Sequence, residues 1–158
     1  WIANINAPKV IVISGEKASL PSALDWAKIR GAKIVSLKVS GAFHSPLMKT
    51  AQEAFEPVLA SIKFADPKIP IVHNVTAELS TSGRESKIAV RRQLVGSVFW
   101  SKSMKAMEKL GAVLFCEFGP GNVLTGLAKR NIPRAVGFAV DSIAALDSFK
   151  QLCLNYRK

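Results

Sequence analysis

The chain has 158 residues, and 49% of them are hydrophobic, which is enough for one domain with a sizeable core and argues against disorder. No apolar stretch approaches the roughly 20 residues that a membrane-spanning helix needs, so we expect no membrane association. The formal net charge of +11 indicates an anionic partner, but the basic residues are scattered and do not alternate with aromatic ones, which argues against nucleic acid.

The first elements in chain order form a predicted βαβ unit. Residues 9–14 have the pattern of a strand, residues 19–30 that of a helix with a proline in its first turn and Gly31 after its end, and residues 33–39 that of a second strand. Alternation of strands and helices is typical of a mainly parallel sheet covered by helices, although the second half of the sheet could differ.

A long helix and another strand follow. Ser45 and Pro46 resemble an N-cap and a first-turn proline, and apolar residues recur at helical spacing over 47–62. Pro57 should kink this helix. Residues 69–76 then have the pattern of a strand.

The remaining chain continues the alternation. The pattern predicts, in order, a helix over 84–95, a helix over 101–110, a strand over 112–118, a helix ending at 130, a strand over 135–140 and a helix over 142–156. The loop 119–121, which is Gly-Pro-Gly, could hold a phosphate on helix amides. It lacks the GxGxxG spacing, so a tight turn is the simpler account.

Histidines and cysteines are the candidate reactive groups. His44 lies between a strand-like segment and a helix start, where general bases of α/β enzymes commonly lie, whereas His73 lies inside a predicted strand and is more simply a packed histidine. Cys116 and Cys153 are far apart without metal-ligand spacing, so we expect reduced thiols and no metal site. No GxSxG motif supplies a nucleophile, and Ser45 is better explained as a helix cap.

Five ordered blocks resemble a known family. They are residues 2–15, VSGAFHSPLMK at 39–49, IPIVHNVTAE at 69–78, RRQLVGSVFW at 91–100 and EFGPGNVLTGLAKR at 117–130. In order and spacing they resemble malonyl-CoA:acyl carrier protein transacylase over essentially the whole chain. The resemblance implies the C-terminal part of an α/β-hydrolase-like acyltransferase core (41–158) and the trailing βαβ part of an incomplete ferredoxin-like small subdomain (1–40).

The resemblance also implies that the chain is a fragment. The family's glutamine-rich loop, its GHSxGE serine motif and the arginine that binds the malonyl carboxylate all precede the matching region. We therefore expect the chain alone to be inactive, to need the missing N-terminal half of the same enzyme as a partner, and to expose surfaces that this half would cover.

Family members transfer malonyl from coenzyme A to the phosphopantetheine thiol of acyl carrier protein in fatty acid biosynthesis, through a serine acyl-enzyme and without a further cofactor. The resemblance makes His44 the general base and acid, and Gln93 the residue whose backbone carbonyl orients the ring. For substrate binding it points to Asn6 and to Phe43, which would crowd a methyl branch and disfavour methylmalonyl. Simpler accounts stay open: a helix surface for Gln93, a turn for Asn6 and core packing for Phe43.

Arg91, Arg92, Lys102 and Lys129 are candidates for docking acidic carrier protein, although most of the basic residues could simply be solvated. Two other functions stay open, namely a non-catalytic module that binds acyl carrier protein and an acyltransferase fragment of a polyketide synthase. We expect a cytoplasmic protein, or a plastid or mitochondrial one in a eukaryote.

Overall fold

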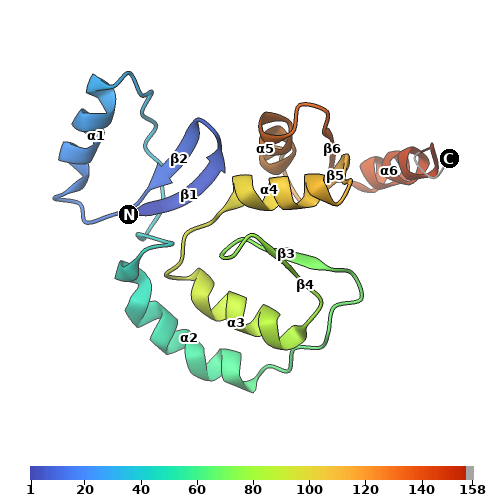
Figure 1. Cartoon of the computed structure of the whole chain (residues 1–158), viewed down its shortest axis with the longest axis horizontal. Coiled ribbons are helices and arrows are strands. Elements are labelled where there is room, and N and C mark those ends of the chain that lie inside the picture. The colour runs from blue at the N-terminus through green and yellow to red at the C-terminus, as the bar shows by residue number, and fades with distance from the viewer. Residues whose placement is uncertain (156–158) are drawn as a thin grey trace. The chain divides into compact units, whose positions relative to one another are not determined.

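The computed structural model describes residues 1–155 (Figure 1). The chain forms two compact units, Trp1–Ser103 and Met104–Lys158, which we call unit 1 and unit 2. Helices alternate with short strands, which pair into three two-stranded sheets among the described residues. None of the helices in this part of the chain is long and apolar enough to cross a membrane.

Unit 1 begins with a β-hairpin and a helix. Strand β1 (Ile2–Ala7), which the sequence pattern did not predict, pairs antiparallel with β2 (Val10–Ile13), and α1 (Leu20–Ile29) follows. The predicted strand over 33–39 is wrong, because these residues form no strand and expose Val35 to 69%. A strand needs a neighbouring strand to pair its backbone N–H and C=O groups. Strand β2 pairs with β1 instead of with residues 33–39. The assignment of residues 1–40 to a small subdomain stays a prediction.

The rest of unit 1 places two helices beside a second hairpin. Its elements are η1 (Pro46–Met48), α2 (Lys49–Ser61), β3 (Ile71–His73), β4 (Glu78–Ser80) and α3 (Gly83–Gln93). Helices α2 and α3 and strand β3 confirm predicted elements, whereas β4 was not predicted. Pro57 lies inside α2. Ser82 caps α3 by accepting a hydrogen bond from Glu85 N–H at 3.4 Å.

An extended segment joins the first hairpin to the second. Val98 N–H donates to Ala3 O (2.8 Å), Ile5 N–H donates to Val98 O (2.9 Å), and Phe99 N–H donates to Asn74 O (2.8 Å). The segment therefore ties β1 to the turn after β3.

Unit 2 contains a parallel strand pair. After α4 (Trp100–Lys109), which begins in unit 1, β5 (Leu114–Phe118) and β6 (Val136–Val140) pair in parallel across α5 (Val123–Asn131), and α6 (Ile143–Asn155) ends the described chain. These elements confirm the predicted order, although position 156 of the predicted last helix lies outside the described residues.

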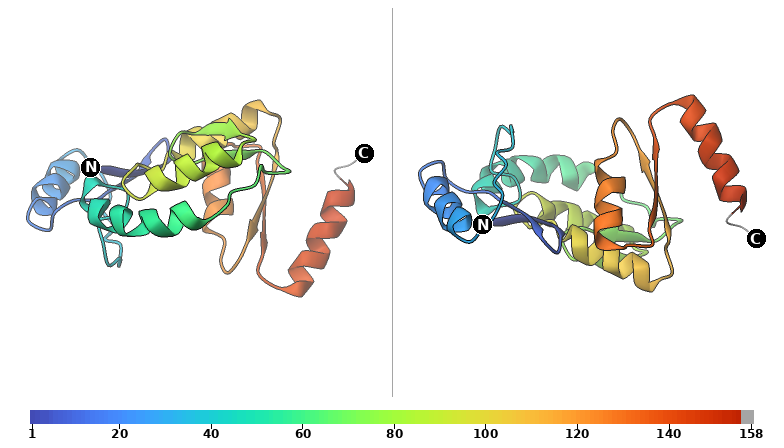
Figure 2. Two further views of the ribbon diagram at one scale, coloured as in Figure 1. Left: turned by 90° about the horizontal axis from the view of Figure 1, so that it is seen from below. Right: turned by 90° about the horizontal axis from the view of Figure 1, so that it is seen from above.

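The strand pair of unit 2 has a helix on each side. Figure 2 shows α5 and α6 on opposite sides of the two strands. The ring of Phe149 on α6 packs against Phe118 and Phe138, with ring centroids 6.0 and 5.6 Å apart. Because the other two described pairs are antiparallel hairpins, the prediction of a mainly parallel sheet is wrong; only β5 and β6 have a helical crossover between paired strands.

Gly137 on β6 lies against α5, and a Cβ atom there would come within 2.8 Å of Thr125 Cβ. Gly137→Ala should lower the free energy of unfolding by about 1–3 kcal/mol, because strand or helix must shift. The matched control is Gly126→Ala on α5, where a Cβ meets nothing within 4 Å and alanine is the better helix former. Urea unfolding measures both, and equal stability of the two variants would contradict the close packing.

Candidate active site

His44 lies in the loop before η1 with its backbone in the left-handed region, at φ +61°. A non-glycine residue in this region costs of order 1–3 kcal/mol and persists only when its surroundings hold it there. The side chain is half-buried. The contacts that hold this residue therefore define the candidate site.

The end of helix α3 supplies two of these contacts. His44 N–H donates to Leu94 O at 3.1 Å, and His44 Nδ1 lies 2.9 Å from Gln93 O. The last carbonyls of an α-helix have no partner within the helix and are available as acceptors. The structure thus brings together His44 and Gln93, which are 49 residues apart in sequence, through the backbone carbonyl of Gln93.

The contact with Gln93 defines which ring nitrogen carries the proton. A carbonyl oxygen only accepts, so Nδ1 is the donor, and in the neutral ring the lone pair then lies on Nε2. The Gln93 side-chain amide also lies 3.4 Å from Nδ1, which would need the opposite tautomer. That amide donates to Gly96 O at 3.0 Å, and the shorter 2.9 Å contact decides the tautomer. Nε2 is therefore the basic nitrogen.

The loop on either side of His44 is hydrogen bonded as well. Ser14 Oγ donates to Phe43 O (3.1 Å), and the buried Ser45 Oγ donates to Ala42 O (2.6 Å). Ser45 stands at the N-cap position of η1, but its side chain makes no cap bond. The prediction of a capping hydroxyl is therefore wrong, because the loop brings Ala42 O within reach of the hydroxyl.

The two predicted substrate-binding residues lie on different elements. The side chain of Phe43 is 41% exposed, so core packing within the described chain does not account for it. Asn6 lies within strand β1 and is half-buried, and the turn comes after it at residues 8–9. The alternative account of Asn6 as a turn residue is therefore wrong.

The predicted docking residues lie on three different helices. Arg91 and Arg92 lie in the last turn of α3, and Arg91 pairs with Glu56 of α2. The Lys102 ammonium lies over the Phe99 ring, 4.9 Å from its centroid. Lys129 is exposed on α5, in unit 2. Two of the four side chains thus already have a partner within the chain.

The second histidine, His73, is hydrogen bonded to a serine side chain. His73 Nε2 lies 3.1 Å from Ser86 Oγ, and that hydroxyl donates its own proton to Ser82 O at 2.9 Å. Because the hydroxyl proton is used in this way, His73 Nε2 is the donor. Among the described residues, no three side chains of His, Cys, Asp or Glu could together hold a metal ion.

The loop after β5 is a tight turn whose helix end is already satisfied. Gly119 and Gly121 have φ of +132° and +94°, which favour glycine. Glu117 Oε2 accepts a hydrogen bond from Thr125 N–H, in the first turn of α5, at 2.9 Å. The Glu117 carboxylate therefore occupies part of the position that a bound phosphate would need. The loop fits the account of a tight turn better than that of a phosphate site.

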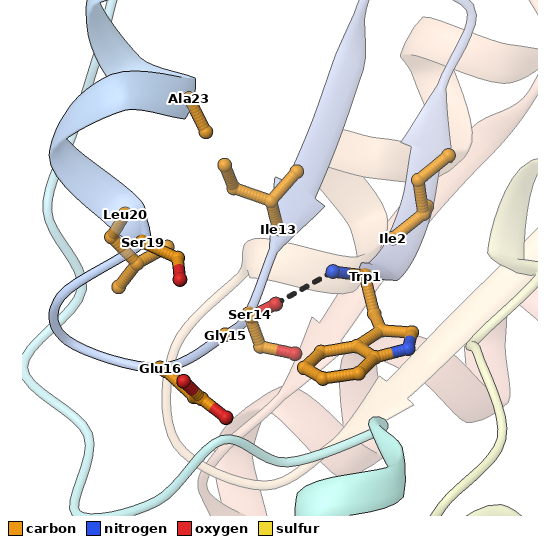
Figure 3. A pocket seen from close by; sticks show the side chains of 9 residues that line it. All are labelled: Trp1, Ile2, Ile13, Ser14, Gly15, Glu16, Ser19, Leu20 and Ala23. Carbon is orange, nitrogen blue, oxygen red and sulfur yellow. Dashed lines mark hydrogen bonds between the residues drawn. The ribbon is translucent and has the colours of Figure 1, made fainter.

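An open pocket of about 510 Å³ lies between the first hairpin and α1 (Figure 3). Its wall is formed by side chains of β1, β2 and the start of α1, including Ile13 and Leu20. His44, Gln93, Phe43 and Asn6 do not line it. The pocket therefore lies beside the candidate site, since Ser14 lines it and also contacts Phe43 O.

No model of a known protein family matches the chain. The malonyl CoA-acyl carrier protein transacylase of Synechocystis is 36% identical to it over 151 residues, which cover 96% of this chain and 50% of that protein. The crystal structure of an acyl carrier protein S-malonyltransferase from Vibrio cholerae has 37% identity and a TM-score of 0.89, covering 94% of this chain and 49% of that one.

A malonyl-transacylase solved in complex with a type II polyketide synthase acyl-carrier protein is similar too. It has 36% identity and a TM-score of 0.87, and the match covers 93% of this chain and 48% of that one. The chain therefore spans about half the length of the curated relatives and solved structures it matches.

The neutral rings of the two histidines should carry their protons on opposite nitrogens. The Gln93 carbonyl requires Nδ1–H in His44, and the Ser86 hydroxyl requires Nε2–H in His73. Long-range proton–nitrogen correlation spectra of the chain, recorded with both rings neutral, distinguish the two tautomers. His73 is the internal control, and an Nε2–H tautomer at His44 would contradict the contact.

Glu117 should make stability depend on pH. The Thr125 N–H donates to the carboxylate and holds the pKa of Glu117 below its usual range. The resulting stability is fully present above the pKa of an unfolded glutamate, about 4.3, and is lost as the pH falls through the lower folded-state pKa.

Glu117→Gln should therefore be less stable than the unsubstituted chain near pH 7, and the difference should shrink toward about pH 3. Urea unfolding at both pH values measures it. Glu53→Gln, at an exposed position on α2, is the control and should change little at either pH. A difference between Glu117→Gln and the native chain that does not vary with pH would contradict the charged contact.

Proposed function

The chain is homologous to the C-terminal half of the malonyl CoA-acyl carrier protein transacylases, and we propose that it supplies the histidine-bearing half of such an acyltransferase. In this proposal the enzyme moves malonyl from coenzyme A to the phosphopantetheine thiol of acyl carrier protein. The observation that carries it is the 2.9 Å contact between His44 Nδ1 and Gln93 O, because it leaves Nε2 as a general base of defined orientation.

The proposed reaction has two acyl transfers. A serine outside these 158 residues attacks the malonyl thioester, His44 Nε2 takes the hydroxyl proton, and the leaving coenzyme A thiolate receives that proton as the C–S bond breaks. His44 then takes the proton of the carrier thiol, which attacks the acyl-serine, and returns it to the serine oxygen. The Gln93 carbonyl holds Nδ1–H throughout, in the place that an aspartate has in a Ser-His-Asp triad.

The architecture of the relatives is proposed for this chain in the same way. The parallel unit β5–α5–β6 supports an α/β-hydrolase-like core over 41–158, and the first hairpin with α1 supports part of a ferredoxin-like subdomain over 1–40. Ile29 on α1 is 83% exposed and Ile143 on α6 is 82% exposed. Apolar side chains this exposed support the proposal that the N-terminal half of the enzyme covers them.

The substrate and partner follow from the same proposal. Phe43 stands next to the base, and its exposed ring supports selection of malonyl over an acyl group with an α-methyl branch, with Asn6 as a second binding residue. The net charge of +11 supports docking to acidic carrier protein, with exposed Lys129 and the end of α3 as contacts. The complex of a related malonyl-transacylase with a polyketide synthase carrier protein keeps a polyketide carrier as a second candidate.

A module that only binds carrier protein is less well supported. Binding alone does not need a histidine in the left-handed region with one nitrogen fixed by a carbonyl. Strained backbone of this kind is concentrated at active sites and ligand clamps.

The test is to produce the chain together with the N-terminal half of a related transacylase and to measure malonyl transfer from coenzyme A to carrier protein. His44→Ala should reduce the rate about 10²–10⁴-fold, the usual contribution of a general base. His73→Ala is the matched control, because His73 contacts Ser86 rather than the site, and it should retain activity. Transfer that survives His44→Ala would overturn the role of His44, and carrier binding without any transfer would favour the binding module.

A further inference from the structure

We propose that Ser14 is a positioning residue for His44, which acts by holding the peptide group between Phe43 and His44. The inference rests on the proposed role of His44 as the base. The contact itself, however, can be measured without any enzymatic activity, so the two proposals can fail separately.

The peptide group before His44 is bound at both of its polar ends. Its C=O, from Phe43, accepts a hydrogen bond from Ser14 Oγ at 3.1 Å, and its N–H, from His44, donates to Leu94 O at 3.1 Å. In a trans peptide the C=O and N–H lie in one plane and point in opposite directions. The end of β2 therefore holds this plane from one side and the end of α3 holds it from the other.

The orientation of this plane matters because φ of His44 is the next rotation along the chain. At +61° it is in a region that a non-glycine residue leaves unless it is held. Rotation of the Phe43–His44 peptide would change φ and carry the ring away from Gln93 O, since that contact spans only 2.9 Å. Holding the peptide thus also holds the ring.

Ser14 is itself fixed in the hairpin. Its N–H donates to Trp1 O (3.0 Å) and its C=O accepts from Trp1 N (2.8 Å), and Figure 3 shows both residues at the end of the β1–β2 pair. The hairpin is fixed in turn by the hydrogen bonds of Val98 with Ala3 and Ile5. Ser45, by contrast, bonds to Ala42 of its own loop and cannot attach the loop to another element. Ser14 therefore links the base to the first hairpin.

The experiment compares Ser14→Ala, Ser14→Val and Ser14→Thr in the 158-residue chain. The valine and threonine side chains have nearly the same shape, and only threonine has a hydroxyl. Comparing them therefore distinguishes the effect of losing the hydroxyl from the effect of side-chain size. Ser148→Ala is the matched control, because its hydroxyl also donates to a carbonyl at 3.1 Å, on α6. Hydrogen exchange of the His44 amide and the ring nitrogen shifts of His44 are measured in each.

Loss of one ordinary hydrogen bond should lower the exchange protection of the His44 amide by about two- to tenfold in the alanine and valine variants. The His44 ring should shift from Nδ1–H toward a mixture of tautomers. The threonine variant and Ser148→Ala should keep both signals. In the assembled acyltransferase, alanine and valine should lower kcat by about the same factor and leave KM for malonyl-CoA unchanged, because binding is not affected.

Unchanged exchange and ring shifts in both hydroxyl-free variants overturn the proposal. Equal losses in threonine and valine overturn it too, because the side-chain shape rather than the hydroxyl would then be responsible. Altered His44 signals with an unchanged kcat overturn the positioning role. If the assembled enzyme shows no transfer that depends on His44, the proposed function fails, while the exchange and ring measurements still decide the contact.

Discussion

A neutral backbone carbonyl, that of Gln93, holds the ring of His44 through a 2.9 Å hydrogen bond to Nδ1, and the chemistry available to this chain depends on that contact. A carbonyl fixes the tautomer and direction of an imidazole as an aspartate does, but it brings no full negative charge. The Gln93 carbonyl is available as an acceptor because the last carbonyls of a helix such as α3 have no donor within the helix. The same helix end also accepts the His44 amide through Leu94.

Two parts of unit 1 contact the loop that carries this residue, and a third part holds one of them. The end of β2 contacts the peptide before His44, and the end of α3 accepts hydrogen bonds from its amide and ring. The third part, the segment around Val98, does not contact His44 but ties the first hairpin to the turn after β3. The left-handed backbone of His44 is thus maintained by contacts from elements that are distant in sequence. Strain of this kind persists only where several contacts act together.

Other candidate functional groups of the sequence are bonded to other residues of the chain. The Gly-Pro-Gly turn leads into a helix whose Thr125 N–H binds the Glu117 carboxylate, His73 binds a serine hydroxyl, and Arg91 pairs with Glu56. These contacts concern the stability of the fold, so they leave His44 as the candidate base of the proposed function.

Sequence by itself determined the local elements and the residue of interest. Apolar spacing and glycine stops located α3, α4, β5, α5 and β6 to within a few residues, because helix ends and short buried strands depend on nearby residues. The motifs singled out His44, and the family resemblance singled out Gln93. Only the tertiary structure decided which strands pair, so residues 33–39 carry a strand pattern without a partner, and β1 and β4 went unpredicted. It also decided the positive φ of His44 and its contact with the end of α3, because both arise from groups about 50 residues apart, which no local pattern encodes.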